Sequence, residues 1–450
     1  MFTETHSLII SEISQVTTTI FTEMSFFCHC LGVNYVQTAG IIIEYNPMHS
    51  GHLYLLEQVR ARLGADTAVI CAMSGNFVQR GDFALLRKHQ RARAAVESGA
   101  DLVLEIPLPW AAAPAERFAD GGVQVLQATG LVDCLAFGSE CGDAVALRQV
   151  AGALMSREFP ALLRRELTAG DSFAAARQRA VSALLGPETG NLLVSPNNIL
   201  GVEYCKALLR HKSAMHVLTV SRRGAAHDGA LHSGEHPSAS ALRALLTGGE
   251  RERALKLLPP AMGQAYLEEE AAGRAPVLAS ACERAVLARL RSMTEADFAA
   301  LDPGREGLCN RLYQAARTAS TLEELLRTAK TRRYPYARLR RMVLWAYLGL
   351  TPAKLPERMA YLRVLAANTR GRELLGRMRH TASLPVLTKP ADVRRLSTDA
   401  QQLLELEARS TDLYTLAYPN LVAASGGAEW REGPVICLFP GKSPKGAFLW

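Results

Sequence analysis

The sequence predicts an α/β protein in which an open, mostly parallel sheet is followed by a mainly helical region. Short runs of β-branched and apolar residues alternate with helix-like segments up to Val220, an order typical of parallel sheets. Beyond Gly249 the strand signals fade, and Ala, Leu, Arg and Glu dominate from Arg251 to about Arg379. We therefore expect a domain boundary near Gly249, between residues 35–249 and residues 250–450.

The expected elements can be placed along the first half of the chain. Residues 41–43 are consecutive isoleucines, which suit a strand buried on both faces. Apolar residues at three-residue spacing from Leu53 to Val59 then indicate a helix, with Ser50 as its expected N-cap. Further strands are predicted at residues 66–73, 101–106, 135–137 and 217–220, and further helices at residues 87–99, at 202–209 and from 238 onward.

Composition indicates an ordinary globular protein with a polyanionic partner. Of the 450 residues, 48% are hydrophobic and 21% are charged, and the net charge is +8. No Lys or Arg precedes Arg60, so the positive charge belongs to the later chain and points to nucleic acid. Nine dispersed cysteines without a Cys-x-x-Cys pair indicate reduced thiols in the cytoplasm rather than a disulfide framework or a zinc ribbon.

No membrane or secretory segment is predicted. The chain has no apolar run as long as a membrane span. Residues 1–34 lack the positive region of a secretory signal. We expect this stretch to be an extension that is either absent from the native protein or disordered.

The chemistry is expected where the first strand gives way to the first helix, in the run from Gly40 to His52. Asn46-Pro47 is a chain-reversal signal, and His49 and His52 follow it three residues apart on one face of the helix N-terminus. Unpaired N–H groups and the helix dipole favour anions there, and two imidazoles add donors for phosphate oxygens. Nucleotidyl transfer, in which attack on an α-phosphate expels pyrophosphate, is the implied reaction. A bare His-x-x-His pair also fits a surface coincidence or half of a metal site.

Two other segments can contribute to such a site. The polar loop from Ser74 to Gly81 follows the second strand, at the edge of a parallel sheet where ligands sit, and its amides and small polar groups suit a carboxylate. Ser238, Ser240 and Arg243 can set hydroxyls and a guanidinium against the β- and γ-phosphates. The alternative for these last residues is a plain helix cap.

The densest basic patch lies in the second half of the chain. Its cations are interleaved with Tyr334 and Tyr336, a combination that fits phosphate contacts and base stacking, although a solvated helix face has the same composition. The cations assigned to nucleic-acid binding are Lys330, Arg332, Arg333, Arg338, Arg340 and Arg341.

Several of these motifs together resemble one family, the bacterial tRNA(Met) cytidine acetate ligases of the HIGH-type nucleotidyltransferase superfamily. The matching segments run from about Tyr35 into the C-terminal region, and residues 1–34 lie outside them. They are Ile43-Glu-Tyr-Asn-Pro-x-His-x-Gly-His52, Met73-Ser-Gly-Asn-Phe-Val-Gln-Arg-Gly81, Gly99-Ala-Asp-Leu-Val103, Phe137-Gly-Ser-Glu140, Pro196-Asn-Asn-Ile-Leu-Gly201 and Lys330-Thr-Arg-Arg-Tyr334.

The resemblance implies a Rossmann-like nucleotidyltransferase domain and a two-step reaction. Acetate and ATP give acetyl-adenylate, and the acetyl group then passes to the N4 amine of the wobble cytidine of elongator tRNA(Met). The family's ATP contacts carry over to Ile42, Ile43, Glu44, Tyr45, Asn46, Pro47, Met48, His49, Ser50, Gly51, His52, Leu53, Tyr54, Leu55, Gly138, Asn197 and Arg222. Met48 and Ser50 depart from the commoner Phe and Asn.

The remaining partners follow from this chemistry. Acetate is expected at the loop that holds Ser74, Gly75, Asn76 and Gln79. Mg²⁺ is expected with the triphosphate, although no carboxylate cluster identifies protein ligands for a metal. No stable protein partner is indicated. Two alternatives stay open: an adenylyltransferase that makes a dinucleotide cofactor, and a non-catalytic tRNA-binding factor with a regulatory nucleotide site.

Overall fold

The computed structural model describes residues 37–167, 172–222, 237–302, 307–331 and 333–438. A mixed, mostly parallel sheet runs through its centre in the order β10-β8-β5-β2-β1-β6-β7, with β9 paired to β8. The strands are β1 (Thr38–Ile43), β2 (Ala68–Ser74), β5 (Leu102–Ile106), β6 (Cys134–Ser139), β7 (His216–Ser221), β8 (Leu362–Ala367), β9 (Val386–Leu387) and β10 (Val435–Ile436), and a separate hairpin joins β3 (Phe77–Val78) to β4 (Asp82–Phe83).

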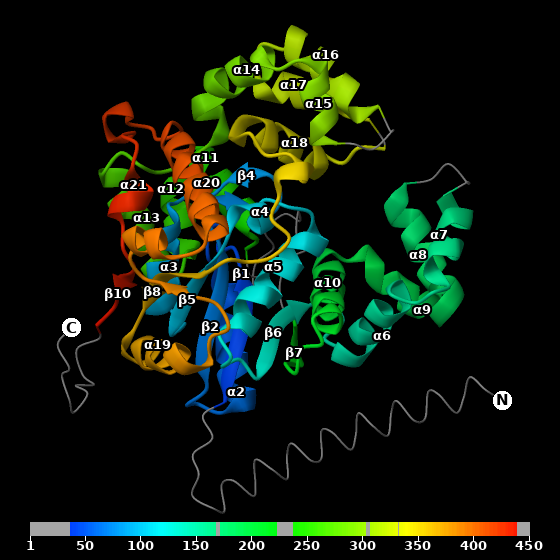
Figure 1. The fold of residues 1–450 in the computed structure, drawn as a ribbon, viewed down its shortest axis with the longest axis vertical. Coiled ribbons are helices and arrows are strands. Elements are labelled where there is room, and N and C mark those ends of the chain that lie inside the picture. The colour runs from blue at the N-terminus through cyan, green and yellow to red at the C-terminus, as the bar shows by residue number, and fades with distance from the viewer. Residues whose placement is uncertain (1–36, 168–171, 223–236, 303–306, 332, 439–450) are drawn as a thin grey trace, which may run out of the picture.

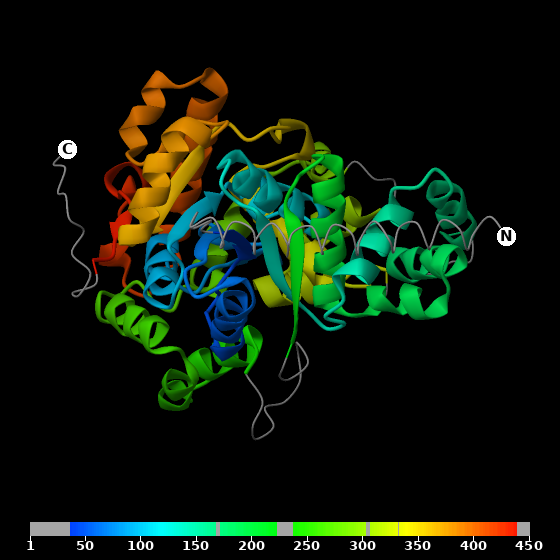
Figure 2. The same cartoon turned by 90° about the horizontal axis from the view of Figure 1, so that it is seen from below.

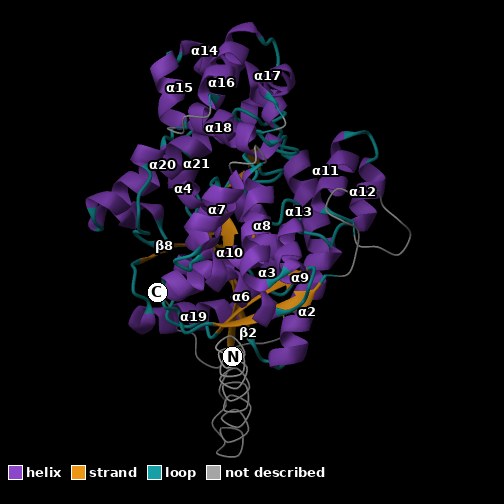
Figure 3. Ribbon diagram, turned by 90° about the vertical axis from the view of Figure 1, so that its right-hand side faces the viewer, coloured by secondary structure: helices purple, strands orange, loops and turns teal. Residues whose placement is uncertain are grey.

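Helices cover both faces of the sheet and extend from it in two directions (Figure 1, Figure 2). They are α2 (Ser50–Leu63), α3 (Lys88–Glu97), α4 (Leu108–Ala111), α5 (Ala115–Ala128), α6 (Ala144–Leu154), α7 (Phe159–Leu167), α8 (Phe173–Leu185), α9 (Pro187–Gly190), α10 (Pro196–Arg210), α11 (Ala239–Thr247), α12 (Arg251–Leu257), α13 (Pro260–Ala271), α14 (Glu283–Ser292), α15 (Glu295–Leu301), α16 (Leu308–Thr318), α17 (Leu322–Ala329), α18 (Tyr336–Leu348), α19 (Thr369–Thr381), α20 (Thr398–Thr415) and α21 (Ala428–Arg431). Helices α6 to α9 form one projection, and α14 to α18 gather at the top in Figures 1 and 3.

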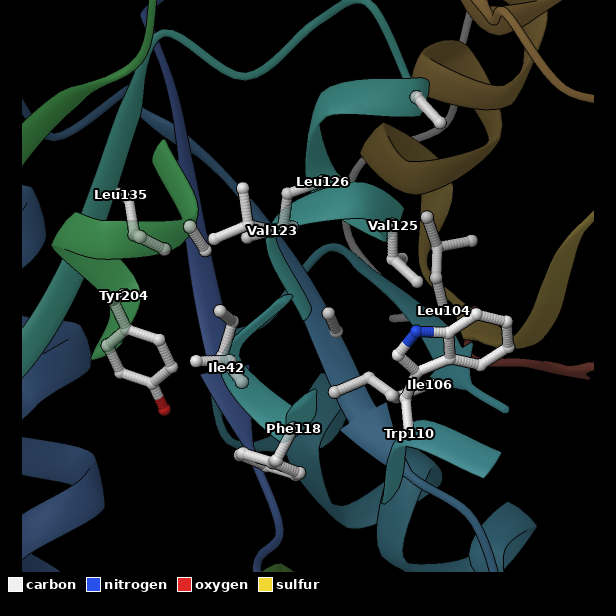
Figure 4. Packing of buried hydrophobic residues seen from close by; sticks show 14 of the residues in the cluster. Ile42, Leu104, Ile106, Trp110, Phe118, Val123, Val125, Leu126, Leu135 and Tyr204 are labelled. Atoms are coloured by element: carbon white, nitrogen blue, oxygen red, sulfur yellow. The ribbon is translucent and has the colours of Figure 1, made fainter. Parts of the chain in front are cut away.

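Alternating residues of the buried strands belong to two different hydrophobic cores, because successive side chains of a strand point to opposite faces of the sheet. Ile42 of β1 packs with α5 and α10, whereas Ile41 and Ile43 pack with α2 and α3 on the other face. Figure 4 shows Ile42 among Phe118, Val123 and other residues of the first core. Gly122 permits this packing, since a Cβ there would lie 2.6 Å from Ile42 Cδ1.

The strands and helices predicted in the first half of the chain are confirmed. All five expected strands, β1, β2, β5, β6 and β7, belong to the central sheet, and each pairs in parallel with its neighbours in that set. The prediction of a polar loop from Ser74 to Gly81 is wrong in part, because Phe77 and Val78 pair with Phe83 and Asp82 in a hairpin.

The second half of the chain is mainly helical, but the sequence missed its three strands. β8 runs antiparallel to β5 and extends the central sheet, and β9 and β10 both pair with β8. These strands escaped detection because β8 is a single short run, Leu362–Ala367, within a stretch rich in Ala, Leu and Arg. A boundary at Gly249 stays a prediction, since the sheet itself is built from both sides of that residue.

Helices α14 to α18 surround a third hydrophobic core, which also takes in the β3–β4 hairpin through Phe77 and Phe83. Gly81, between those two strands, has φ +78°, and a Cβ there would collide with the backbone of Arg340 and Arg341. The hairpin therefore lies directly against helix α18, and this contact joins the helical cluster to the sheet.

The remaining sequence expectations concern the N-terminal residues, the cysteines and membrane-spanning segments. Residues 1–34, expected to form an extension, lie outside the described residues. The cysteines within the described ranges are all free thiols. Among the helices that the structure describes, none has both the length and the apolar character needed to cross a membrane.

Candidate active site

The two histidines of the first motif lie where β1 turns into α2. His49 is the N-cap residue of α2 and is 5% exposed, so the prediction of Ser50 as the cap was wrong by one residue. The His49 Nδ1 atom accepts a hydrogen bond from Gly51 N at 3.1 Å, and the His52 Nδ1 atom accepts one from His49 N at 3.2 Å. This reciprocal pair is a capping box in which both side chains are imidazoles.

The capping contacts fix the proton position on both rings. An imidazole nitrogen that accepts a hydrogen bond cannot carry a proton, so each neutral ring must hold its proton on Nε2. The rings stack with centroids 3.7 Å apart, and Tyr45 lies against His52 at 4.7 Å. Burial, followed by the charges of His49 and Arg222, lowers the pKa of His52 well below 6.5, so its ring is neutral at pH 7. The His52 Nε2–H is thus a donor on an uncharged imidazole.

The rest of the first motif divides into buried residues and partly buried residues. The buried residues are Ile42, Ile43, Tyr45, Asn46, Pro47 and Met48, and Met48 is fully enclosed. The partly buried residues are Glu44, Ser50, Gly51, His52, Leu53, Tyr54 and Leu55. A ligand at this turn would therefore meet mainly the latter set and the backbone of the helix start.

A second predicted group, Gly138, Asn197 and Arg222, is brought together beside the first. Gly138 is the penultimate residue of β6, and a Cβ there would lie 3.3 Å from Arg222 Cγ. The Arg222 Nη1 atom lies 3.4 Å from Asn197 Oδ1, and both residues are accessible at the surface. Since Arg222 also acts electrostatically on His52, these residues and the histidine pair border one region of the sheet edge.

Glu140 organises this second group, although sequence reasoning gave it no role. Its carboxylate accepts hydrogen bonds from Asn197 N at 3.1 Å, from Asn197 Nδ2 at 2.7 Å and from Asn198 N at 2.7 Å. These amides are at the start of α10, where helix N–H groups lack partners within the helix. Glu140 belongs to the quoted segment from Phe137 to Glu140, but only its position in space reveals the contacts.

The loop expected to bind acetate is held rigidly by neighbouring polar groups. Asn76 is buried and fixed by three contacts, to Lys88 N, Thr411 Oγ1 and Ala84 N. Gln79 N donates to Glu44 Oε1 at 2.7 Å. Ser74 is fully buried, and its hydroxyl has no hydrogen-bond partner among the described residues. Gly75 is also buried, so acetate binding by this loop stays a prediction.

Arg91 connects that loop to the first motif and was also missed. It lies on α3, is fully buried, and donates to the carbonyl oxygens of Glu44, Ser74 and Gly75. Burial lowers the pKa of the Arg91 guanidinium to about 10, which leaves it charged at neutral pH. In the sequence, Arg91 is one of several cations at a basic helix start, Arg87 to Arg93, and nothing distinguishes this buried arginine from the others.

The third predicted group, Ser238, Ser240 and Arg243, contacts the first motif through one of its members. Ser238 caps α11 by accepting a hydrogen bond from Ala241 N at 3.1 Å, which agrees with the plain-cap alternative for that residue. Arg243 instead donates to Asn46 O at 2.6 Å, and it also contacts Ser240 Oγ at 3.2 Å. Arg243 therefore lies at the turn that carries the histidines, whereas the Ser238 hydroxyl is used as the N-cap of α11.

The basic patch is only partly available at the surface. Arg333 and Arg340 are exposed, but Arg338 forms an ion pair with Asp302 at 2.7 Å. Arg341 donates to Gln79 O at 3.2 Å, and burial lowers its pKa to about 10. Lys330 donates to Thr331 O and lies over the Tyr336 ring, while Arg332 is outside the described residues.

Metal binding by the protein alone has no support from the arrangement of side chains. Within the described ranges, no group of three or more His, Cys, Asp or Glu side chains is placed to hold a metal ion. Mg²⁺ usually keeps several waters and binds through substrate phosphates, and such a mode needs few protein ligands.

Comparison with known proteins gives consistent matches over most of the chain. The profile of the family described as HIGH Nucleotidyl Transferase matches residues 36–428. A tRNA(Met) cytidine acetate ligase of Acetivibrio thermocellus is 36% identical over 415 residues, which cover 89% of this chain and 100% of the relative. One from Caldanaerobacter subterraneus subsp. tengcongensis is 35% identical over 391 residues, with coverage of 86% and 96%.

Solved structures give the same fold. The apo crystal structure of Thermotoga maritima TmcAL has a TM-score of 0.85 and 30% identity, and covers 90% of this chain and 100% of its own. The structure of that protein bound with alpha-thio ATP has a TM-score of 0.83 at the same identity and coverage. The predicted α/β fold and the family resemblance are both confirmed.

Proposed function

Because the chain belongs to the tRNA(Met) cytidine acetate ligases of the HIGH nucleotidyltransferase family, we propose that it joins acetate to the wobble cytidine of elongator tRNA(Met) at the expense of ATP. The product is N4-acetylcytidine, and we assign the activity to the cytoplasm. The alpha-thio ATP held by Thermotoga maritima TmcAL supports ATP as the nucleotide.

The first step is activation of acetate. A carboxylate oxygen attacks the α-phosphorus of ATP, the bond to the bridging oxygen of pyrophosphate breaks, and acetyl-adenylate remains. Negative charge builds on the phosphate oxygens as pyrophosphate leaves, and donors aimed at that charge lower the barrier. The observation that carries this proposal is the stacked imidazole pair at the start of α2, in which the His52 Nδ1 atom accepts from the His49 amide so that its Nε2–H is a donor.

The other residues of the site hold the nucleotide. Glu140 orients Asn197 at the start of α10, and Arg222 supplies a cation beside it. Arg243, fixed to Asn46 O, is suited to the β- and γ-phosphates. Mg²⁺ would accompany ATP and neutralise charge on the triphosphate, and no step assigned here to a protein residue depends on it.

The second step transfers the acetyl group. The N4 amine attacks the acetyl carbonyl carbon, a C–N bond forms, the C–O bond to AMP breaks, AMP leaves with the electron pair, and a proton of the amine is released to solvent. Prior activation is needed because the lone pair of a cytosine amine is delocalised into the ring. Exposed Arg333 and Arg340 are proposed to contact the tRNA phosphates.

The test is mass spectrometry of nucleosides from elongator tRNA(Met) after incubation with the protein, ATP and acetate. We expect N4-acetylcytidine, and none when ATP or acetate is omitted. Acetate-dependent exchange of pyrophosphate into ATP should accompany it. Pyrophosphate release that needs a mononucleotide and ignores acetate would instead identify a dinucleotide-forming adenylyltransferase, and tRNA binding without either reaction would identify a non-catalytic factor.

A further inference from the structure

A cavity of about 300 Å³ lies between the β3–β4 hairpin and helices α14, α17 and α18. Its walls include the aromatic rings of Phe83 and Tyr347, and Asp82, Glu323 and Arg340 add polar groups. This volume is at the lower end of the range of about 300–1,000 Å³ for small-molecule sites. None of the site residues described above except Arg340 lines it.

The cavity lies close to the histidine turn. The hairpin that forms one wall is tied to the first motif, since Gln79 N donates to Glu44 Oε1 at 2.7 Å. Arg341, next to the lining residue Arg340, donates to the Gln79 carbonyl. Burial lowers the pKa of Arg243, and the charge of the Asp82 carboxylate raises it. These two side chains are therefore close enough to interact electrostatically. Arg243 in turn contacts Asn46 O at 2.6 Å.

The chemistry of the lining suits an unstacked base. Aromatic and aliphatic walls take the faces of a base, and proteins read single-stranded RNA loops by splaying bases into such sites. A carboxylate accepts a hydrogen bond from the exocyclic amine of cytosine, but it repels the O4 atom of uracil because both are acceptors. Arg340 is exposed and forms no hydrogen bond or ion pair within the described part of the chain, so it is available for a backbone phosphate.

We propose that this cavity is the cytosine site: the target base of the tRNA enters between the β3–β4 hairpin and α18, with its N4 amine at Asp82 and its backbone phosphate at Arg340. The proposal rests on the ligase function given above. It makes Asp82 the residue that distinguishes cytidine from uridine, and it gives the hairpin a role in aligning the amine with the acetyl-adenylate.

The experiment compares two half-reactions in the same preparation. Acetate-dependent pyrophosphate exchange reports activation, and single-turnover acetylation of elongator tRNA(Met) reports transfer. For Asp82→Asn we expect the ratio of transfer to exchange to fall by roughly tenfold or more, the scale of one lost base contact. Asp82→Asn should also bind tRNA with cytidine or uridine at the wobble position about equally, whereas the wild type prefers cytidine.

A bulky side chain provides a second test. Ser280 is exposed and lines the cavity, so Ser280→Trp should fill the entrance and lower the same ratio. Ala281 is the exposed neighbour in the same short helix and does not line the cavity, so Ala281→Trp is the matched control and should match the wild type. Thermal unfolding checks that both variants fold.

Each result has a definite consequence. Wild-type transfer-to-exchange ratios in Asp82→Asn and in folded Ser280→Trp would overturn the cytosine site while leaving the ligase function intact. Equal loss of transfer in Ala281→Trp would also count against it, since a tryptophan outside the cavity would then have the same effect. Absence of acetate-dependent exchange in the wild type would instead refute the ligase function itself.

Discussion

Two substitutions can distinguish the structural role of His52 from its chemical role. Its Nδ1 atom accepts from the His49 amide, and its Nε2–H is the proposed phosphate donor. We expect His52→Ala to lower acetate-dependent exchange by roughly a hundredfold or more, the usual effect of removing one donor to developing charge. His52→Gln can keep the capping box, because glutamine serves at that helix position, yet should lose activity to a similar degree.

The readouts are exchange rate and thermal unfolding. Glu57→Ala, exposed on the same helix, is the control and should change neither. Full activity in a folded His52→Gln variant would show that only the cap matters and would remove the catalytic role of the ring.

Glu140 has a positioning role that predicts a specific kinetic change. Its carboxylate accepts three N–H groups at the start of α10, and an amide in its place would turn a donor toward one of them. We expect Glu140→Gln to raise KM for ATP about tenfold, the scale of one lost hydrogen bond to a charged group, with a smaller change in kcat. Glu188→Gln, at the exposed start of α9, is the control. A change confined to kcat would contradict this role.

At the scale of elements, helix α18 and the segment before it offer two exposed arginines to the tRNA. We expect Arg333→Gln combined with Arg340→Gln to weaken tRNA binding and to reduce the slope of log Kd against log salt concentration by about 1.5, as for two lost phosphate contacts. Arg341 is left unchanged because it holds the Gln79 carbonyl.

The matched control replaces two other exposed arginines, Arg394 and Arg395, on a short helix beside β9. Filter binding at several salt concentrations gives the slopes. An equal change of slope in both double variants would mean that the effect comes from net charge and not from the surface at α18.

At the scale of the whole molecule, a buried charge network ties the first half of the chain to the last. Lys88 of α3 contacts Glu105 of β5 at 2.7 Å and Glu429 of α21 at 2.8 Å, and Arg363 of β8 contacts Glu429 at 3.0 Å. Glu407 of α20 lies beside this network. Burial, followed by the charge of Glu105, raises the pKa of Glu407 to about 8, so the folded protein holds it protonated at neutral pH.

This arrangement predicts a pH-dependent stability. An unfolded glutamate titrates near pH 4.3, so the stability associated with protonated Glu407 is complete below that pH and is lost as pH rises through about 8. Glu407→Gln mimics the protonated form, and its advantage in Tm over the wild type should grow from pH 5 to pH 8.5. Glu405→Gln, exposed on the same helix, should show no such trend. An advantage that stays constant with pH would contradict the prediction.

The sequence by itself determined the alternation of strands and helices before Gly249, the family and the turn that carries His49 and His52. These features are local, because periodic apolar residues and a strand-turn-helix run are legible within a few positions. Tertiary structure alone decided that β8 and β10 extend the sheet, that Asp302 neutralises Arg338, and that Glu140 and Arg91 hold the site in place. Such contacts join residues far apart in the chain, and their partners exist only once the backbone has folded.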